Sequence, residues 1–368
     1  MKPDIRKPVL LLDAERCKRN IRRMSDKARK DNVIFRPHFK THQSAEIGEW
    51  FREEGVECIT VSSLSMAKYF ADSGWKDIAL AVAVNVLEID SINELASRIK
   101  LNLLVESADA VAKLSKGLVH EVGIFVELDT GQHRTGVDGD DTRGILDLAW
   151  LVSIQPLMKF KGLLTHSGNA YQAAVPTQIA MIATGVASKL SLLKTVFQGD
   201  FPEIIVSVGD TPTCCIADNF QLVDEIRPGN FVFFDVMQFR LGVCNLEDIA
   251  VALAAPVISV HPERNEAVIY GGAIHFSKDH YVDADRKVVF GWVCNLANHG
   301  WSAPIPGLTL ASLSQEHGII RGSKEHISQL KIGDVLAILP VHSCLTANLM
   351  GRYLDLEGKE IEMFRYGK

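Results

Sequence analysis

Residues 32–42 read Asn-Val-Ile-Phe-Arg-Pro-His-Phe-Lys-Thr-His and join a short apolar run to a group of cationic and imidazole side chains. The run Val33–Phe35 predicts a buried strand, and the polar group begins where this strand ends. A charged lysine is costly to bury, and lysines that lose their charge by burial serve enzymes as Schiff-base formers and bases. We therefore take Lys40 as a candidate catalytic residue. An exposed lysine after an edge strand is the alternative that this stretch leaves open.

Alternation of strand and helix patterns continues on both sides of this stretch. After a strand at 8–13 and a helix at 14–31, strands that alternate with helices are expected at 33–35, 58–61, 78–82, 101–105, 122–128, 160–165, 204–208 and 230–234. Short strands that are apolar on both faces are typical of a parallel sheet covered by helices. The number and even spacing of the units favour a closed (β/α)₈ TIM-type barrel over an open doubly wound sheet. No G-x-G-x-x-G motif opens the first helix, which weakens the dinucleotide-binding alternative.

The rhythm changes after residue 245, where helical patterns become scarce. Strand patterns interrupted by Pro and Gly turns are found at 250–260, 266–270, 287–290, 307–313 and 335–339. This pattern predicts a second, mainly antiparallel β domain. We expect a barrel at 14–244 and a β domain at 245–368, with residues 1–13 open to joining the β domain.

Net charge, apolar runs and cysteine content indicate which partners and which cellular compartment to expect. Lys and Arg number 39 against 45 Asp and Glu, and a net charge of −6 argues against nucleic acid as a partner. The sequence contains no uninterrupted run of about 18 apolar residues, so no membrane span is expected. The first residues lack the apolar core of a signal peptide. Seven scattered cysteines without a C-x-x-C pair fit a reducing cytoplasm better than a disulfide framework.

Polar clusters follow the predicted barrel strands, at the strand ends where barrel enzymes carry their functional residues. Besides the group at Lys40, such clusters occupy 129–136, 166–171 and 207–213, and a further cluster at 227–230 precedes the last expected barrel strand. The segments around Gly209 and Gly229 fall after the late strands, where barrels often bind phosphate through backbone N–H groups and hydroxyls. That these glycines only make turns is the alternative.

A last cluster, His342-Ser343-Cys344, lies in the β domain. Imidazole and thiolate together suit zinc, and two protein ligands would leave positions open for substrate or water. Chance occurrence of His-x-Cys and simple burial of a cysteine are the alternatives. The group Gln315-Glu316-His317-Gly318 is expected to be either a partner of the metal ligands or a solvated turn.

From Pro8 to near its C-terminus the chain resembles the fold-type III pyridoxal-phosphate enzymes, the alanine racemase superfamily. Within it, the chain is most similar to the branch of D-serine dehydratases and D-threonine aldolases. The motif Arg36-Pro37-His38-x-Lys40-Thr41-His42 resembles the cofactor-lysine motif of that branch. Asp129-Thr-Gly-x-x-Arg134-x-Gly136 resembles a motif shared with alanine racemases.

The resemblance implies that Lys40 is the covalent anchor of pyridoxal phosphate and takes the Cα proton of the substrate. It implies a cofactor site in which Arg134 faces the ring hydroxyl, Arg227 approaches the pyridine nitrogen, and backbone amides of Gly229 and Asn230 contact phosphate. The remaining residues that it implies in cofactor binding or proton handling are His38, His166, Tyr171, Gly209 and Thr211, with Arg36 and His42 nearby.

The resemblance also places a metal region at 315–318 and 342–348, with His342 and Cys344 as ligands of zinc or another divalent metal. Cysteine at position 344 is typical of zinc-dependent D-serine dehydratases, whereas D-threonine aldolases carry Asp there. Two residues depart from the family pattern: Asp210, beside the expected phosphate segment, and Val341, before the metal histidine.

The predicted activity is therefore a pyridoxal-phosphate- and zinc-dependent lyase for a D-β-hydroxy amino acid, with β-elimination of the D-serine dehydratase type. A D-threonine aldolase or a β-hydroxyaspartate dehydratase on the same scaffold is the nearest alternative. A racemase is disfavoured because no tyrosine suited to a second base stands out in the β domain. A non-catalytic cofactor-binding protein is disfavoured because such proteins are usually single barrels. The resemblance also implies a homodimer.

Overall fold

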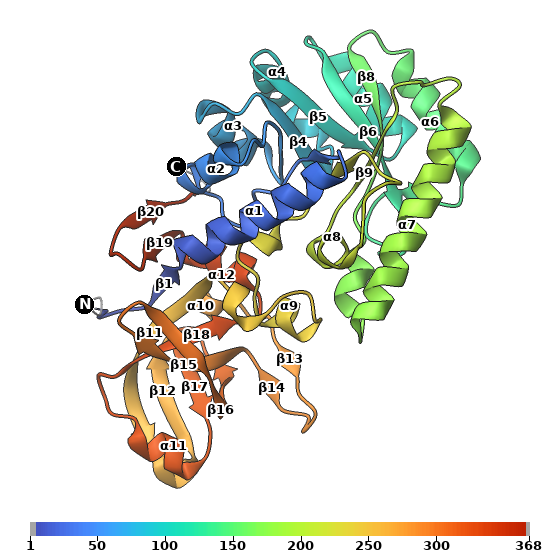
Figure 1. Cartoon of the computed structure of the whole chain (residues 1–368). Coiled ribbons are helices and arrows are strands. Elements are labelled where there is room, and N and C mark those ends of the chain that lie inside the picture. The colour runs from blue at the N-terminus through green and yellow to red at the C-terminus, as the bar shows by residue number, and fades with distance from the viewer. Residues whose placement is uncertain (1–4, 366–368) are drawn as a thin grey trace. The chain divides into compact units, whose positions relative to one another are not determined.

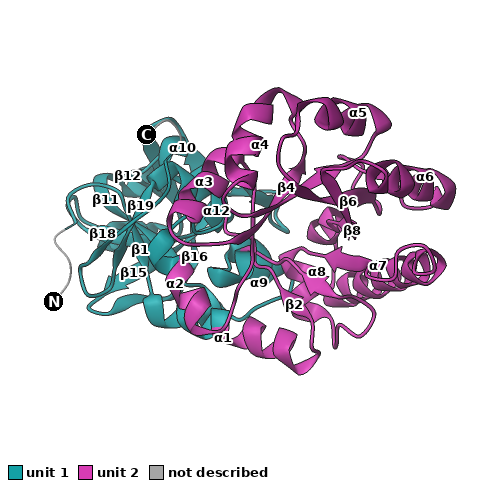
Figure 2. Cartoon of the chain, turned by 90° about the horizontal axis from the view of Figure 1, so that it is seen from above, with its two compact units in different colours: residues 1–21, 41–47, 230–368 teal, residues 22–40, 48–229 magenta. Residues whose placement is uncertain are grey.

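The structure is a computed structural model that describes residues 5–365. The chain forms two compact units, which Figure 2 shows in different colours. One unit comprises Met1–Ile21, Thr41–Ile47 and Asn230–Lys368, and the other comprises Arg22–Lys40 and Gly48–Gly229. The chain thus passes from one unit to the other four times, after Ile21, Lys40, Ile47 and Gly229.

The second unit contains a parallel barrel. Its strands follow the order β2 (Ile34–Phe35), β10 (Glu225–Ile226), β9 (Ile205–Val208), β8 (Met158–Thr165), β6 (Val122–Asp129), β5 (Lys100–Val105), β4 (Asp77–Ala83) and β3 (Ile59–Val61), and β7 (Val137–Asp138) pairs only with β6. The two ends meet just beyond β2, where His38 bridges Thr60 in parallel. There the amide of Phe39 donates to Thr60 O over 2.8 Å, and the amide of Thr60 donates to Pro37 O over 2.9 Å. The expected (β/α)₈ barrel is confirmed.

Helices follow the strands along the chain. They are α1 (Ala14–Lys30), α2 (Ala45–Glu53), α3 (Leu64–Asp72), α4 (Ile89–Ala96), α5 (Ala108–Gly117), α6 (Thr142–Ser153), α7 (Pro176–Phe197) and α8 (Thr211–Ile216), with 3₁₀ turns η1 (Val86–Glu88) and η2 (Gly168–Gln172). Ser63, Ser107 and Asp141 begin α3, α5 and α6 by accepting a hydrogen bond from an amide three residues on. Such caps satisfy helix N–H groups that have no partner within the helix.

Among residues 5–365, only α7 is long and apolar enough to cross a membrane by length and composition, although polar residues interrupt it. Its buried side chains, Ile179, Val186, Leu190, Leu193 and Phe197, recur at helical spacing and form one stripe. Figure 1 shows α7 as the long green helix beside β9 and α8. A helix that covers a barrel needs such a stripe, so its composition has an explanation without a membrane.

The last barrel strand lies earlier than the sequence predicted. Strand β10 ends at Ile226 and pairs with both β9 and β2, whereas Asn230–Val232 form a 3₁₀ turn, η3. The amides of Phe233 and Phe234 both donate to Asn230 O, over 3.0 and 2.8 Å, so the chain curls back instead of extending. The predicted strand at 230–234 is therefore wrong, and Arg227 follows the last strand rather than preceding it.

The first unit contains an antiparallel barrel. Its strands are β11 (Val251–His261), β12 (Glu266–Tyr270), β17 (His317–Arg321), β16 (Gly300–Leu313), β15 (Gly291–Ala297) and β18 (Val335–Pro340). Because β11 pairs with both β12 and β18, these strands close on themselves. The expected mainly antiparallel domain is confirmed, although the sequence did not predict β15, β17, or the later β19 (Arg352–Asp355) and β20 (Glu360–Glu362). Strand β1 (Val9–Leu12) pairs antiparallel with β11 and parallel with β19.

Short elements complete this unit. They are the strands β13 (Tyr281–Val282) and β14 (Val288–Val289), the helices α9 (Val236–Arg240), α10 (Ala273–Phe276), α11 (Lys324–Gln329) and α12 (Ser343–Met350), and the 3₁₀ turns η4 (Leu246–Asp248) and η5 (Pro262–Arg264). The end of β18 leads within three residues into α12, whose first turn contains Cys344. The candidate metal ligands therefore lie where an apolar strand gives way to a helix.

Candidate active site

Phe39 anchors the segment that carries the candidate lysine. Its ring is fully buried, with ring centroids 4.9 Å from Phe51, 5.0 Å from Phe70 and 5.1 Å from Trp75. Lys40, the next residue, is exposed. The expectation that Lys40 is buried is therefore wrong, and the buried ring of its neighbour Phe39 anchors this segment.

Several imidazole and cationic side chains converge at this end of the barrel. Burial lowers the pKa of His38 well below its ordinary value, and the charges of Lys40, Arg227 and Arg134 lower it further. Burial also lowers the pKa of His166 to about 4, although its hydrogen bond to Gly209 opposes the shift. Both histidines are therefore neutral at pH 7, and the remaining positive charges form a site suited to an anion.

The bond that orients His166 also defines its tautomer. Its Nδ1 donates to the carbonyl oxygen of Gly209 over 2.6 Å, which leaves Nε2 as an acceptor. The ring centroid of Tyr171 lies 6.4 Å from that of His166. The structure thus brings these two predicted residues together beside the segment that follows β9.

Arg227 is held by a buried network beneath the strand ends. Its Nε donates to Ser207 Oγ over 2.7 Å, and its guanidinium also donates to Thr165 O. Ser207 Oγ donates to Glu225 Oε1 over 2.7 Å, and Glu225 Oε2 accepts from Arg36 Nε over 2.6 Å. Arg36 supports the site indirectly, because it pairs with the carboxylate that orients Ser207 and so Arg227.

The two segments expected to bind phosphate lie side by side after β9 and β10, the seventh and eighth barrel strands in chain order. A Cβ on Gly209 would lie 2.7 Å from Cβ of Arg227 and 2.9 Å from its backbone. Only glycine allows these loops to approach so closely. Barrel phosphate sites are commonly built from the loops after these strands. Gly229 lies in the loop after β10, and Thr211 is the first residue of α8, directly after the β9 loop.

The loop that carries Arg134 is tied to its own strand. Asp129 Oδ1 accepts from the amides of Gly131, Gln132 and His133 over 2.9, 3.0 and 3.0 Å. Gly136 has a φ of +108°, and a Cβ there would lie 2.6 Å from the amide nitrogen of Asp129. The Asp and Gly of the predicted motif therefore shape the loop, while Arg134 itself is exposed.

The β unit brings the two candidate metal ligands together. Burial lowers the pKa of His342, but hydrogen bonds to Asp279 and Cys344 outweigh burial, and the pKa lies well above its ordinary value. Burial raises the pKa of Cys344, but hydrogen bonds with His342, Thr41 and Asn230 outweigh burial and lower it. A thiol that favours its thiolate form beside an imidazole is a suitable donor set for zinc.

Polar groups surround the sulfur of Cys344. Thr41 Oγ1 lies 3.3 Å and Asn230 Nδ2 3.4 Å from it. The Asn230 side chain also donates to Asp235 Oδ2 over 2.8 Å, and the same oxygen accepts from the Ser343 amide over 3.0 Å. The side chain of Asn230 is thus committed to the cysteine cluster, so the predicted phosphate contact concerns its backbone amide alone.

Outer residues hold the histidine. The Nδ1 of His342 lies 2.6 Å from Asp279 Oδ2, which leaves Nε2 for a metal. Residues 5–365 contain no group of three or more His, Cys, Asp or Glu side chains placed to hold a metal ion. Metal binding by His342 and Cys344 therefore stays a prediction, and Asp279 is a hydrogen-bond partner of His342 that the sequence did not reveal.

Two other predicted residues serve the framework. His42 is fully buried, and its Nδ1 accepts from the amide of Ser44 over 3.1 Å. Glu316 O accepts from the amide of Gly271 over 2.9 Å, in the turn between β16 and β17. The turn at 314–316 therefore supports the chain that enters α10, and Asp279 follows α10 by three residues.

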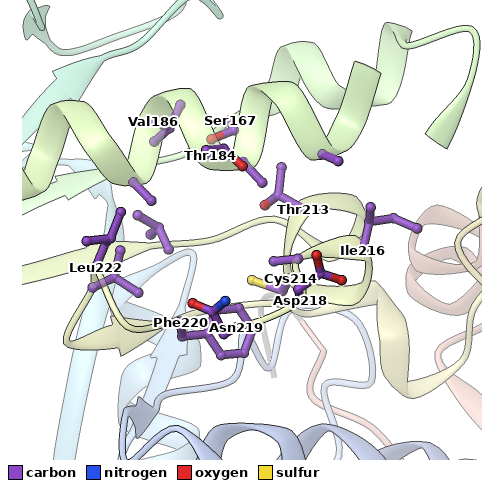
Figure 3. Close-up of a pocket in the computed structure, with 16 residues that line it drawn as sticks. Ser167, Thr184, Val186, Thr213, Cys214, Ile216, Asp218, Asn219, Phe220 and Leu222 are labelled. Atoms are coloured by element: carbon purple, nitrogen blue, oxygen red, sulfur yellow. The ribbon is translucent and has the colours of Figure 1, made fainter. Parts of the chain in front are cut away.

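A cavity of about 240 Å³ lies in the barrel unit between α7, α8 and the loop that follows α8 (Figure 3). Ser167, Thr184, Thr213, Cys214 and Asn219 are among its lining residues. None of the predicted site residues lines it. The cavity lies beside α8, the helix that begins at the expected phosphate segment.

Comparison with known proteins agrees with this geometry. The family model described as "Alanine racemase, N-terminal domain" matches residues 12–236, and the model "Putative serine dehydratase domain" matches residues 250–355. The chain belongs to the alanine racemase superfamily of fold-type III pyridoxal-phosphate enzymes. Pyridoxal phosphate is the cofactor expected for this family.

Relatives within the superfamily are dehydratases and aldolases, which are lyases. The chain is 32% identical to D-threo-3-hydroxyaspartate dehydratase of Delftia sp. HT23, covering 95% of this chain and 93% of the relative. It is 31% identical to D-serine dehydratase of Dictyostelium discoideum, covering 98% and 96%. It is 26% identical to D-threonine aldolase of Arthrobacter sp., covering 93% and 86%.

The solved structure of the Delftia dehydratase superposes on this fold with a TM-score of 0.90 and covers 98% of each chain. Further structures of that enzyme are a histidine-to-alanine variant and a cysteine-to-alanine variant described as metal-free. The two substituted positions are two residues apart, the same spacing as His342 and Cys344.

Proposed function

We propose that the protein is a lyase that acts on a D-β-hydroxy amino acid, with dehydration to a 2-oxo acid and ammonia as its reaction. The observation that carries this proposal is the arrangement of the His342–Cys344 pair, in which the sulfur of Cys344 lies 3.3 Å from Thr41 Oγ1 and the Nδ1 of His342 lies 2.6 Å from Asp279 Oδ2. Loss of a β-hydroxyl needs a Lewis acid or proton donor at that oxygen, and such a pair can hold a metal for this purpose.

Pyridoxal phosphate would supply an electron sink for the electron pair left when the substrate loses its Cα proton. Lys40 would hold the cofactor covalently and take that proton, because it is accessible at the end of a barrel strand. The positive groups around His38 and His166 suit the anionic phosphate and the carboxylate of an amino acid. Contacts to the cofactor are proposed for His38, Arg134, Tyr171, Gly209, Thr211, Arg227, Gly229 and Asn230.

His166 is proposed to handle a proton or to orient the cofactor together with Tyr171. Its neutral Nε2 can accept a hydrogen bond because Nδ1 donates to Gly209 O. A neutral imidazole can accept a proton at Nε2, whereas an imidazolium could not.

Zinc or another divalent metal is proposed to bind His342 and Cys344. A metal there would supply Lewis acidity to a hydroxyl group. Thr41, whose hydroxyl lies 3.3 Å from the cysteine sulfur, is the residue directly after Lys40. Lys40 and the residue that contacts the Cys344 sulfur are thus neighbours in the chain. This proximity in sequence supports a joint role of Lys40 and the metal pair in one reaction.

A substrate panel tests the reaction. D-serine should give pyruvate and ammonia, whereas aldolase activity on D-threonine would give glycine and acetaldehyde. D-threo-3-hydroxyaspartate belongs in the panel because the 32% identical relative is named for its dehydration. Each substrate is assayed after chelation and again after zinc is restored. Racemisation without elimination or cleavage would contradict the proposal.

We further propose a homodimer, as the family resemblance implies, and light scattering on the purified protein tests it. The cytoplasm is the proposed compartment, because the seven scattered cysteines include no C-x-x-C pair and do not indicate a disulfide framework.

A further inference from the structure

Asp210 is a buried carboxyl group in the segment that follows the seventh barrel strand. Its side chain is 3% exposed, and it begins α8 as the N-cap residue. Its Oδ1 accepts from the amide of Thr213 over 2.7 Å, and its Oδ2 accepts from the Thr213 hydroxyl over 2.5 Å. The carboxyl group therefore engages both donors that Thr213 would otherwise offer to an anion in this loop.

The charges around this carboxyl group are few. Arg227 faces it from the loop after β10, and Cys214 lies beside it on α8 itself. His166, from the end of β8, is neutral and bonded to Gly209 O, while Lys27 of α1 donates to the carbonyl oxygens of Cys214 and Cys215 over 2.8 and 2.9 Å. From α7, the residues that line the cavity beside α8 are uncharged: Ala180, Ala183, Thr184, Val186 and Ala187.

Burial raises the pKa of Asp210 to about 7, although the bonds from Thr213 and the charge of Arg227 oppose the shift. A carboxylate in this loop would repel a phosphate dianion, since two like charges in a buried site interact strongly. A neutral carboxyl group would remove the repulsion and provide one O–H donor.

We propose that phosphate binding in this loop is coupled to the uptake of one proton by Asp210. The proton comes from the buffer and forms an O–H bond on the carboxylate, while the phosphate makes no covalent bond with the protein. This inference rests on the proposed cofactor site. Under it, the protonation of Asp210 determines how cofactor affinity depends on pH. It follows from linkage that affinity falls as pH rises above 7, by at most about tenfold per pH unit.

Calorimetry with pyridoxamine 5'-phosphate tests the proposal, because this probe carries the phosphate but has no aldehyde to react with Lys40. The cofactor-stripped full-length protein is titrated at pH 8 in two buffers of different ionisation enthalpy, which yields the number of protons taken up on binding. Wild type should take up close to one proton more than Asp210→Asn or Asp210→Ser. Titration of the probe itself is common to all variants and cancels.

Asp141→Asn is the matched control, because Asp141 caps α6 as Asp210 caps α8 but is exposed. It should behave as wild type. Equal proton uptake by wild type and both Asp210 variants would overturn the proposal, as would the same Asp210-dependent uptake with pyridoxamine, which lacks the phosphate. Thermal melts test whether each variant is folded. If Asp210→Asn does not fold, Asp210→Ser replaces it in the comparison with wild type. If no folded variant bound the probe, the cofactor assignment itself would be overturned instead.

Discussion

The Nδ1 atom of His342 lies 2.6 Å from Oδ2 of Asp279, so a carboxylate holds the imidazole of the candidate metal site. A carboxylate at Nδ1 keeps that nitrogen protonated and directs Nε2 to the metal, and it makes the ring a stronger donor. Asp279 lies 63 residues before His342 in the chain. Nothing in the sequence around either residue shows this pairing.

Replacing Asp279 by Asn should weaken zinc binding by roughly 10- to 100-fold, the usual cost of losing such a partner. Zinc affinity is measured by competition with a chromophoric chelator, and the ligand field is read from the spectrum of the cobalt-substituted protein. Asp285→Asn is the control, because Asp285 is exposed in the turn between β13 and β14. Unchanged zinc affinity and an unchanged cobalt spectrum would show that Asp279 does not position the ligand.

Replacing Cys344 by Ala should remove the metal and leave the cofactor in place, because the cysteine lies with the β unit and Lys40 with the barrel unit. Metal content is measured by mass spectrometry and bound cofactor by its visible absorbance. Cys294→Ala is a suitable control, since Cys294 is buried in strand β15 of the same unit. Full dehydratase turnover by protein proven to be metal-free would refute the metal role.

Sequence periodicity predicted the barrel well where burial follows one simple stripe. Helix α7 spans Pro176–Phe197 and buries one apolar stripe along its length. The last strand was misplaced because the apolar run 231–234 is buried in a turn, whereas the true strand contains Glu225. That carboxylate is fully buried, and its bonds to Arg36 and Ser207 make burial possible. A hydropathy pattern cannot reveal a buried charge whose partners are distant in the chain.

The candidate site divides in the same way. Short motifs indicate Lys40, His342 and Cys344, because each stands among several cationic, imidazole or thiol side chains within a few residues of sequence. Thr41 and Asp279 were not recognised as partners of the metal pair, since Thr41 is 303 residues from Cys344 and only the fold brings them together. Local sequence thus indicates candidate reactive groups, and tertiary contacts determine their tautomer and charge.

Replacing Lys40 by Ala should abolish covalent attachment of pyridoxal phosphate and reduce turnover by several orders of magnitude, since the proposed anchor and base are one group. Absorbance of the bound cofactor and mass spectrometry after borohydride reduction report the attachment. Lys30→Ala, at the exposed end of α1, is the control. Detection of the reduced adduct on another lysine in the Lys40 variant would assign the anchor elsewhere.

The buried His42 should make the protein less stable in mild acid. Burial lowers its pKa to about 3, below the ordinary value of 6.5, so the unfolded chain binds this proton more readily than the folded chain. Stability from this group is therefore fully present above pH 6.5 and is lost as pH falls from 6.5 toward 3, by up to about 1.4 kcal/mol per pH unit.

Urea unfolding between pH 7 and pH 4.5 measures this slope. The variant His42→Asn should show a smaller loss of unfolding free energy across the range, even if it is less stable at pH 7. His317→Asn is the control, because His317 is exposed at the start of β17 and should leave the slope unchanged. If His42→Asn loses as much stability per pH unit as wild type, His42 does not cause the acid sensitivity.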